Sequence, residues 1–263
     1  MVNIGGRHMV QSKAWDWGKV SEKDIPYWKT PATESYYLAS RWQQQAKQDF
    51  LDLGCGLGRH SVFFAKKGFH TSAFDLSRDA VEQTQKWARA EHLAITGTVG
   101  DMLALPYPDA SFDCIFCKDV LSHTDTQGVK KIAADILRIL KPAGECYLTL
   151  GSKKAWGFGQ PWPVVDENTK IRTEAGPENG IPHFYADIGL IEELFQKFTI
   201  LSAQQVEDYI NDGTLHSIGW HWHVLIQKQK ILRTLFRRQY RTLFPSSIGI
   251  LRQIKHRRKI DAK

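Results

Sequence analysis

The chain lacks the apolar runs that would place it in a membrane. No stretch of its 263 residues approaches the ~18 consecutive apolar residues that a membrane-spanning helix requires. Residues 1–13 have no apolar core of the kind found in secretory signal peptides. These absences predict a cytoplasmic protein without a transmembrane segment. Its length allows one large α/β domain with insertions, or two small domains.

Cysteine is also scarce. Four cysteines in a chain of this length do not indicate a disulfide framework. Cys114 and Cys117 are spaced C-x-x-C, but they lie in the apolar run 112–117, which predicts a strand. Side chains three positions apart on a strand point to opposite faces, so these two thiols cannot hold one metal ion. We expect buried, reduced cysteines that act as small apolar side chains.

Acidic residues are nearly missing from one part of the chain. From Lys228 to Lys263 there are twelve Lys/Arg and one acid, whereas the remaining residues carry 23 Lys/Arg and 27 Asp/Glu. Apolar residues recur at helical spacing in 231–243, which predicts a basic amphipathic helix in a tail at 229–263. Such a helix is typical of weak membrane-surface or RNA contact. The alternative, which we favour, is a helix whose apolar stripe packs on the domain.

Three glycines alternate where an apolar run ends. Residues 50–60 read Phe-Leu-Asp-Leu-Gly-Cys-Gly-Leu-Gly-Arg-His, and an apolar segment follows at 62–65. This pattern predicts a strand, a tight turn and a helix start, where bare backbone and free N–H groups can hold a ligand. A dinucleotide fingerprint needs a small residue where Arg59 stands, so a dinucleotide is disfavoured.

An acid follows the next predicted strand. That strand, at 70–74, leads into Asp75, about twenty residues beyond the glycines, where nucleoside-binding folds place a carboxylate for the ribose hydroxyls. The alternative role for Asp75 is to cap the helix expected at 78–91, but Ser77 is better placed for that. We therefore predict that Asp75 binds a ribose.

Several passages resemble, in the right order, the class I S-adenosylmethionine-dependent methyltransferases, especially the small-molecule branch called type 11 or 25. The Asp-x-Gly-x-Gly-x-Gly run that begins at Asp52 is similar to motif I of that family. Residues 105–113, Leu-Pro-Tyr-Pro-Asp-Ala-Ser-Phe-Asp, resemble its LPF-x-D-x-SFD passage. Residues 138–144 resemble its R-x-LKPGG turn, with Ala143 where glycine is usual. The resemblance covers about residues 48–150.

The resemblance implies a fold, a cofactor and a reaction. The fold is an α/β, Rossmann-like, doubly wound sheet of seven strands with the last strand antiparallel. The cofactor is S-adenosyl-L-methionine, and the reaction transfers its methyl group. In the family, an acid after the third strand, here Asp101, binds the adenine amino group, and Lys118 could contact the methionine carboxylate. The predicted cofactor-binding residues are Asp52, Gly54, Cys55, Gly56, Gly58, Asp75, Leu76, Ser77, Asp101, Met102 and Lys118.

The chain then divides into three parts. We expect an aromatic N-terminal arm or lid at 1–48, a methyltransferase domain at 49–228 and the basic helical tail at 229–263. Within the domain, residues 151–186 form an irregular insertion that we expect to cap the substrate, because loops of this length are usually functional. Further helices are expected at about 126–140 and 186–198, and strands at 95–99, 112–117, 146–150, 199–206 and 218–227. The predicted substrate contacts are Tyr27, Trp28, Trp156 and Tyr185.

Four histidines are candidates for the acceptor chemistry: His123, His183, His221 and His223. His123 follows the strand 112–117, at the sheet edge where doubly wound folds bind ligands. His221 and His223 share one face of the last strand, so all four imidazoles could line one cleft. Substrate contact or general base catalysis and a structural role both remain open. No metal is predicted, because no tight ligand spacing accompanies the H-x-H.

The predicted acceptor is a small molecule. The Asp/Asn-Pro-Pro-Tyr/Phe motif of amino-directed nucleic-acid methyltransferases is absent at 118–121, which reads Lys-Asp-Val-Leu. Cys117 is not followed by proline, so covalent pyrimidine methylation is disfavoured. The alternatives are an RNA methyltransferase anchored by the tail and a non-catalytic subunit that binds the cofactor.

Overall fold

The computed structural model describes residues 2–4, 7–9, 12–211 and 215–229. Residues 1–229 form one unit of the chain. The predicted basic tail lies outside the described residues, apart from Gln229. In the described part of the chain, no helix has the length and apolar character needed to cross a membrane. Near the N-terminus, β1 (Val2–Ile4) and β2 (Arg7–Met9) form a small antiparallel sheet.

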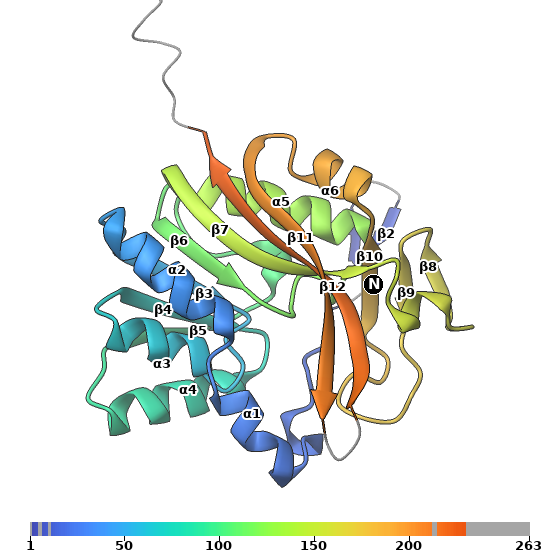
Figure 1. Ribbon diagram of the computed structural model, residues 1–263, viewed down its shortest axis with the longest axis horizontal. Helices are drawn as coiled ribbons and strands as arrows, with labels where there is room; N and C mark the ends of the chain where they lie inside the picture. Colours follow the sequence, from blue (N-terminus) through green and yellow to red (C-terminus); the bar gives the residue numbers. More distant parts are fainter. Residues whose placement is uncertain (1, 5–6, 10–11, 212–214, 230–263) are drawn as a thin grey trace, which may run out of the picture. The chain divides into compact units, whose positions relative to one another are not determined.

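The remaining strands form a ten-stranded sheet (Figure 1). Five of them are parallel, in the order β5 (Ile95–Val99), β4 (His70–Asp75), β3 (Asp49–Leu53), β6 (Phe112–Cys117) and β7 (Leu140–Ser152). β12 (Leu215–Lys228) pairs antiparallel with β7, and β11 (Phe198–Asn211) pairs antiparallel with β12. β12 is therefore the one reversed strand among these seven. The seven-stranded, doubly wound arrangement that the resemblance implies is confirmed.

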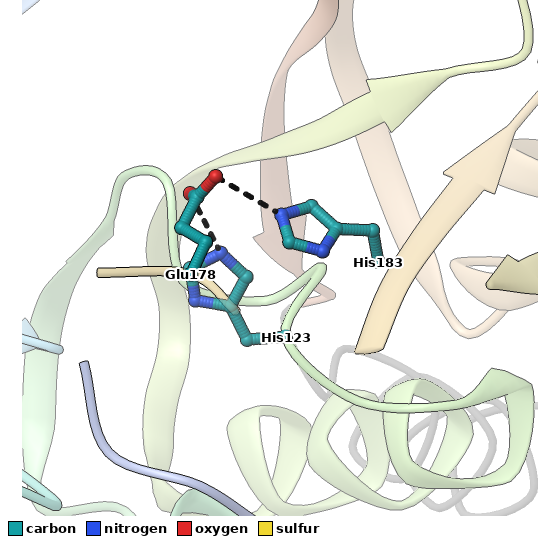
Figure 2. A group of neighbouring side chains, drawn as sticks. All are labelled: His123, Glu178 and His183. Carbon is teal, nitrogen blue, oxygen red and sulfur yellow. Dashed lines mark ion pairs between the residues drawn. The ribbon is translucent and has the colours of Figure 1, made fainter. Parts of the chain in front are cut away.

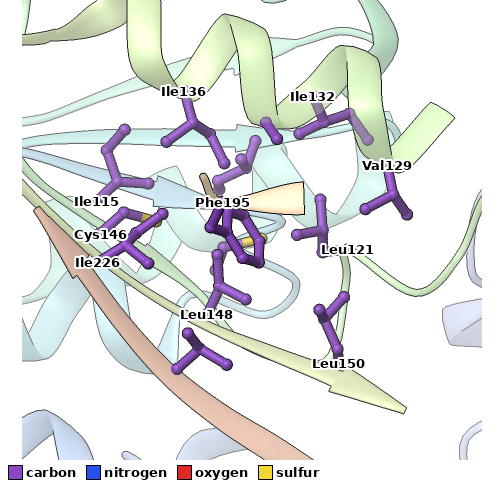
Figure 3. Packing of buried hydrophobic residues seen from close by; sticks show 14 of the residues in the cluster. Ile115, Leu121, Val129, Ile132, Ile136, Cys146, Leu148, Leu150, Phe195 and Ile226 are labelled. Carbon is purple, nitrogen blue, oxygen red and sulfur yellow. The ribbon is translucent and has the colours of Figure 1, made fainter. Parts of the chain in front are cut away.

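Helices cover both faces of this sheet, as the burial of its central parallel strands on both sides requires (Figure 1). On one face lie α5 (Thr126–Ile139) and α6 (Ile188–Leu194), and on the other lie α2 (Thr33–Gln44), α3 (Arg59–Lys66) and α4 (Arg78–Ala90). The apolar stripe predicted at 126–140 packs as expected: Ile132 and Ile136 of α5 meet Leu148 and Ile226 of the sheet (Figure 3).

The second helix belongs to the core, although it lies in the segment predicted as an arm. Its Trp42 is fully buried against Phe50 and Phe64. The Trp42 indole and the Arg41 guanidinium donate hydrogen bonds, each 2.9 Å long, to the buried carboxylate of Glu145 on β7. Burial opposes the charge on Glu145, but these donors outweigh it and hold the pKa of the carboxyl below its ordinary value.

The cysteines follow the sequence prediction. Cys117 packs in the core under α5, whereas Cys114 packs in the core under α2 and α3, so the two side chains point to opposite faces of β6. All four cysteines are buried, and none forms a disulfide bond. Burial raises the pKa of the Cys117 thiol, as it does for the other three, which keeps them protonated at neutral pH.

The insertion at 151–186 is more regular than its sequence indicates. It contains the 3-10 turn η4 (Trp156–Gly159) and the strands β8 (Val164–Asp166), β9 (Thr169–Ile171) and β10 (Pro182–Ala186). β10 pairs with the end of β7 through Tyr185 and Gly151, so the insertion is joined to the main sheet. Its strands are three to five residues long, which is too short for a periodic pattern to develop.

Several expected boundaries were also wrong. β7 begins at Leu140 and not at Cys146, because the expected turn at 141–144 is a bulge in which Ala143 has a positive φ of 63°. The helix expected at 186–198 is limited to α6. β11 and β12 are longer than predicted, since they continue as a two-stranded ribbon beyond the part of β12 that pairs with β7 (Figure 1).

Candidate active site

The glycine turn joins β3 to α3 in a conformation that other residues would resist. Gly54, Gly56 and Gly58 have φ of 80°, 51° and 89°, a backbone region that L-residues rarely adopt. A Cβ atom on Gly54 would lie 2.2 Å from the side chain of Val120, and one on Gly58 would lie 2.7 Å from Thr84. The turn therefore presents bare backbone at the carboxyl end of the sheet, as predicted.

Two carboxylates stand beside this turn. Asp75, at the end of β4, accepts hydrogen bonds from the N–H groups of Gly56 at 2.9 Å and Ser77 at 2.8 Å. Burial raises the pKa of Asp75, although these hydrogen bonds act to lower it. Asp101 follows β5 and accepts the Leu103 N–H at 2.8 Å, which starts the 3-10 turn η3 (Met102–Ala104). Both carboxylates are thus held by backbone donors in fixed orientations.

A cavity of about 810 Å³ extends from this turn to the insertion. The predicted cofactor-binding residues that line it are Gly54, Cys55, Gly56, Asp75, Leu76, Asp101, Met102 and Lys118. Three others do not line it. Asp52 is buried and accepts the Ser61 hydroxyl at 2.6 Å, Gly58 packs on Thr84, and Ser77 caps α4 by accepting the Ala80 N–H. These three support the turn from behind.

A charged group lies at the end of β6. Lys118 pairs with Asp119 at 3.1 Å, and Arg59 approaches the same carboxylate at 3.8 Å. Burial opposes both charges, but each partner outweighs it, so the pKa of Lys118 is raised and that of Asp119 is lowered. Asp119 has a positive φ of 60° and is tied to Thr149 by hydrogen bonds of 2.7 and 3.0 Å. Strained backbone of this kind persists where the surroundings fix it, often at functional sites.

Aromatic side chains of the N-terminal segment cover one side of the cavity. They come from the turn η1 (Trp17–Lys19), from the residues just before it and from the helix α1 (Ile25–Lys29), and the turn η2 (Glu22–Asp24) lies between η1 and α1. Trp28 packs edge-on against Trp15 at 5.4 Å and Trp17 at 5.5 Å between ring centroids. The Arg59 guanidinium lies 5.1 Å from the Trp28 ring and 5.2 Å from that of Tyr27. All four predicted substrate contacts, Tyr27, Trp28, Trp156 and Tyr185, line the cavity.

Two of these aromatic residues carry unused hydrogen-bond donors. The indole N–H groups of Trp15 and Trp17 are buried and have no partner among the described residues, although both residues line the cavity. A buried donor without a partner costs about 1–3 kcal/mol. A polar ligand in the cavity would satisfy these donors, so the site fits an occupant with hydrogen-bond acceptors.

His123 and His183 meet at the far end of the cavity, with their ring centroids 5.2 Å apart. Glu178 lies between them, 3.7 Å from Nε2 of His123 and 3.5 Å from Nε2 of His183 (Figure 2). Burial and the neighbouring His183 lower the pKa of His123 to about 4. Burial would raise the pKa of Glu178, but the two imidazoles and Arg172 outweigh it and lower the value to about 2. At neutral pH the cluster therefore holds a neutral His123 beside a carboxylate.

The two histidines of β12 lie on one face of the strand, as alternation predicts, but only one reaches the cavity. His221 lines it and shares a 2.6 Å hydrogen bond, through Nδ1, with Asp208 of β11. His223 is buried behind the cavity, where Nδ1 lies 2.7 Å from the Tyr147 hydroxyl and 3.0 Å from Glu34 of α2. The expectation that all four imidazoles line one cleft is therefore wrong for His223, because α2 covers that part of the face.

Part of the chain is similar in sequence to known proteins. Residues 50–144 match the family model of a methyltransferase domain. Sterol 24-C-methyltransferase ERG6A of Gibberella zeae is 30% identical over 122 residues, which are 45% of this chain and 32% of that protein. Malonyl-[acyl-carrier protein] O-methyltransferase of Erwinia billingiae is 32% identical over 130 residues, 49% of each chain. The chain thus matches only a third to a half of the length of these relatives.

The fold has a solved counterpart. A SAM-dependent methyltransferase of Methanosarcina mazei superposes with a TM-score of 0.59 at 20% identity, covering 69% of this chain and 92% of that one. Residues 50–144 are thus similar to a methyltransferase domain, and the fold of the chain is that of the class I S-adenosylmethionine-dependent methyltransferases. The cofactor that this fold implies is S-adenosylmethionine. The fit is good, because the bare glycine turn and the two carboxylates lie together on one wall of the cavity.

Sequence reasoning missed several residues of this methyltransferase site. Arg59 served only to argue against a dinucleotide, yet it joins the aromatic arm to Asp119. Asp119 stands directly after Lys118 at a strand end, and this position in the sequence would have been enough to predict it as a site residue. Glu178 lies in a segment without periodicity, and nothing local in the sequence connects it with His123 or His183. Trp15 and Trp17 were visible only as part of an aromatic-rich arm.

Proposed function

We propose that this domain transfers the methyl group of S-adenosylmethionine to a small-molecule acceptor. The observation that carries the proposal is the single cavity that extends from Gly56, Asp75 and Asp101 to His183 and His221. Its volume of about 810 Å³ lies within the range of small-molecule sites, ~300–1,000 Å³. One wall suits a nucleoside, and the opposite end offers imidazoles and aromatic rings to an acceptor.

At the cofactor end, each residue has a distinct task. Asp75 would accept the ribose hydroxyls, since two backbone donors already orient its carboxylate. Asp101 would accept the adenine amino group. Lys118, kept charged by Asp119, would face the methionine carboxylate. S-adenosylmethionine supplies a methyl group that its sulfonium charge has already made electrophilic.

The remaining work of the protein is orientation and exclusion of water. Trp15, Trp17 and Trp28 form a wall that replaces water on one side of the cavity. Holding two reactants in line can supply several kcal/mol of the barrier reduction without covalent help. A dry site also strengthens each electrostatic contact inside it.

We assign the general base to His221. Asp208 engages its Nδ1, which leaves Nε2 to accept a proton from the acceptor. This pairing resembles the way in which a carboxylate orients a catalytic histidine in other enzymes. Asp208 is then a positioning residue.

Binding and turnover test the proposal separately. Isothermal calorimetry should detect S-adenosylmethionine or its demethylated product, and Asp75→Ala should lose the signal. The matched control is Asp79→Ala, which removes an exposed carboxylate from the first turn of α4. A wild-type protein that binds neither ligand would contradict the proposal.

To identify the acceptor, methyl transfer is assayed with a panel of thiols, amines, hydroxyl compounds and metalloids. With an acceptor from that panel, His221→Ala should lower kcat at least tenfold while the affinity for S-adenosylmethionine is unchanged. If no acceptor yields product although the cofactor binds, the non-catalytic alternative gains and the enzymatic proposal fails.

A further inference from the structure

Three side chains from three segments meet at the acceptor end of the cavity. His123 lies in the loop after β6, Glu178 in the loop between β9 and β10, and His183 on β10 (Figure 2). One ligand atom from each residue lies within 4.8 Å of the other two. Each side chain is largely buried, with 14–18% of its surface exposed. The cluster has no counterpart in the roles assigned above to the cofactor or to His221.

The tautomer of His183 is set by its neighbours. Its Nδ1 lies 3.1 Å from the carbonyl oxygen of Ile181, and a carbonyl can only accept, so Nδ1 carries the hydrogen. The lone pair of a neutral His183 is therefore on Nε2, which faces Glu178. A histidine that donates its second N–H to a backbone carbonyl has the arrangement typical of a metal ligand.

The distances in the cluster suit coordination better than direct hydrogen bonding. The separations between nitrogen and oxygen, 3.5 and 3.7 Å, exceed the ~2.7–3.2 Å of an N–H···O hydrogen bond. Ligand atoms about 2.0–2.1 Å from a tetrahedral zinc ion lie about 3.3 Å from one another. Two acceptor atoms that face each other also repel unless a cation lies between them.

We propose that His123, Glu178 and His183 bind one divalent transition-metal ion of the zinc class. Two imidazole nitrogens and one carboxylate oxygen are a donor set that zinc takes in sites with an open position. All three residues line the cavity, so the open position faces the acceptor. The sequence alone predicts no metal, because no tight ligand spacing accompanies its H-x-H pair, His221 and His223, and neither of these residues belongs to the cluster.

The metal gives the proposed function a substrate class. If the methyl transfer proposed above is correct, a metal at this point would orient an acceptor with a hydroxyl or thiol group and favour its deprotonated form. Metal binding itself does not rest on that function, since the three ligands are complete without a cofactor or an acceptor.

Arg172 competes with the metal. It forms an ion pair with Glu178, and its Nε also lies 3.5 Å from Glu174. Its guanidinium stands 5.9 Å from the Trp162 ring. A cation beside the carboxylate weakens the binding of a second cation, so Arg172→Gln should tighten the metal site. An ion-pair network with a purely structural role would only lose stability in this variant.

The test is a metal titration of the full chain without cofactor. The protein is stripped with a chelator and titrated with Zn²⁺ by calorimetry and with Co²⁺ by visible absorption. We expect one site per chain, with affinity at least tenfold lower in Glu178→Gln and His183→Ala and higher in Arg172→Gln. The exposed His92→Ala is the matched control. Circular dichroism verifies the folding of each variant.

The outcomes separate this proposal from the proposed function. A wild-type chain without a Zn²⁺ site, or a site that survives in both Glu178→Gln and His183→Ala, overturns the metal proposal. The same metal-free protein is titrated with S-adenosylmethionine in a separate experiment. If S-adenosylmethionine does not bind in that titration, the methyltransferase proposal is contradicted and the metal result is unaffected.

Discussion

Asp52 is a carboxylate that lies beneath the glycine turn, and no cationic side chain in the described part of the chain forms an ion pair with it. Only 2% of its surface is exposed, and both the hydroxyl and the backbone N–H of Ser61 donate hydrogen bonds to it. Burial raises its pKa to about 7, because the hydroxyl and the backbone N–H of Ser61 do not replace the lost hydration of a charge. The sequence motif predicts an acid here, but its protonation depends on how deeply the turn covers it.

This pKa predicts how stability changes with pH. The folded chain binds a proton on Asp52 up to about pH 7, whereas the unfolded chain releases it near pH ~3.9. The stabilising contribution of the protonated carboxyl is therefore full below pH ~3.9 and is lost as the pH rises to about 7. Between pH ~5 and ~8 wild type should lose about 3 kcal/mol relative to Asp52→Asn, which cannot ionise.

Urea unfolding of both proteins at the two pH values measures this difference. Asparagine keeps an oxygen for the Ser61 hydroxyl, so the variant should fold. Parallel pH profiles of the two proteins would show that Asp52 is ionised throughout.

For single residues, the sequence predicts a position in the site when the neighbouring residues in the chain determine that position. Gly56 and Asp75 were found because the turn and the following strand end are local patterns, and a hydrogen bond joins the two. Glu178 was not found, because its relation to His123 depends on how the insertion folds over β6. His223 was misplaced for the same reason, since α2 from the start of the chain covers it.

Among the elements, the segment with α1 carries the aromatic wall of the cavity. Trp28 contacts three other aromatic residues, Trp15, Trp17 and Tyr27, and it lies beside Arg59. Its substitution should therefore loosen the whole wall while the core, which begins with α2, stays intact.

We predict that Trp28→Ala weakens S-adenosylmethionine binding about tenfold, or roughly 1.4 kcal/mol. Calorimetry measures the affinity, and thermal unfolding should show little change, since Trp28 lies outside the buried core. Trp87→Ala on α4 is the control, because that indole is bonded to Glu91 and does not line the cavity. Equal affinities in wild type and Trp28→Ala would exclude a role of the arm in binding.

Element boundaries were predictable where burial imposes a pattern. β5 and β6 have the predicted bounds, because β5 is rich in β-branched residues and β6 is an apolar run that is buried apart from Asp113. β12 starts earlier than predicted, because its first residues pair only with β11. β7 starts earlier because a bulge, which the Lys-Pro-Ala-Gly sequence does not distinguish from a turn, continues the strand.

For the molecule as a whole, the order of motifs along the chain was enough to predict the doubly wound sheet. That order reflects a topology in which β4 and then β5 add on one side of β3, and β6 and then β7 add on the other side. The acceptor end was less accessible to prediction, since it combines the arm, the insertion and the β11–β12 ribbon.

The division of the chain at Gln229 gives a prediction for the tail. Removing residues 230–263 should leave the melting temperature within a few degrees of the full chain, because the described core residues lie between Leu38 and Ile226. Binding of S-adenosylmethionine should also be unchanged. A truncated protein that fails to fold, or that loses activity toward a small acceptor, would show that the tail is part of the domain. Loss of activity on RNA alone would favour the RNA alternative.

The position of Trp17 has a kinetic consequence. Its ring lies 2.7 Å from the place where a Cβ of Gly56 would be, so the arm lies directly over the glycine turn. α2, which follows the arm, is fixed to β7 through Glu145 and cannot lift with it. We therefore propose that the segment before α2 opens and closes once in each catalytic cycle. The time that a ligand stays bound at the glycine turn is then set by this opening and not by diffusion. A burst of product in the first turnover would be the kinetic signature of such a step.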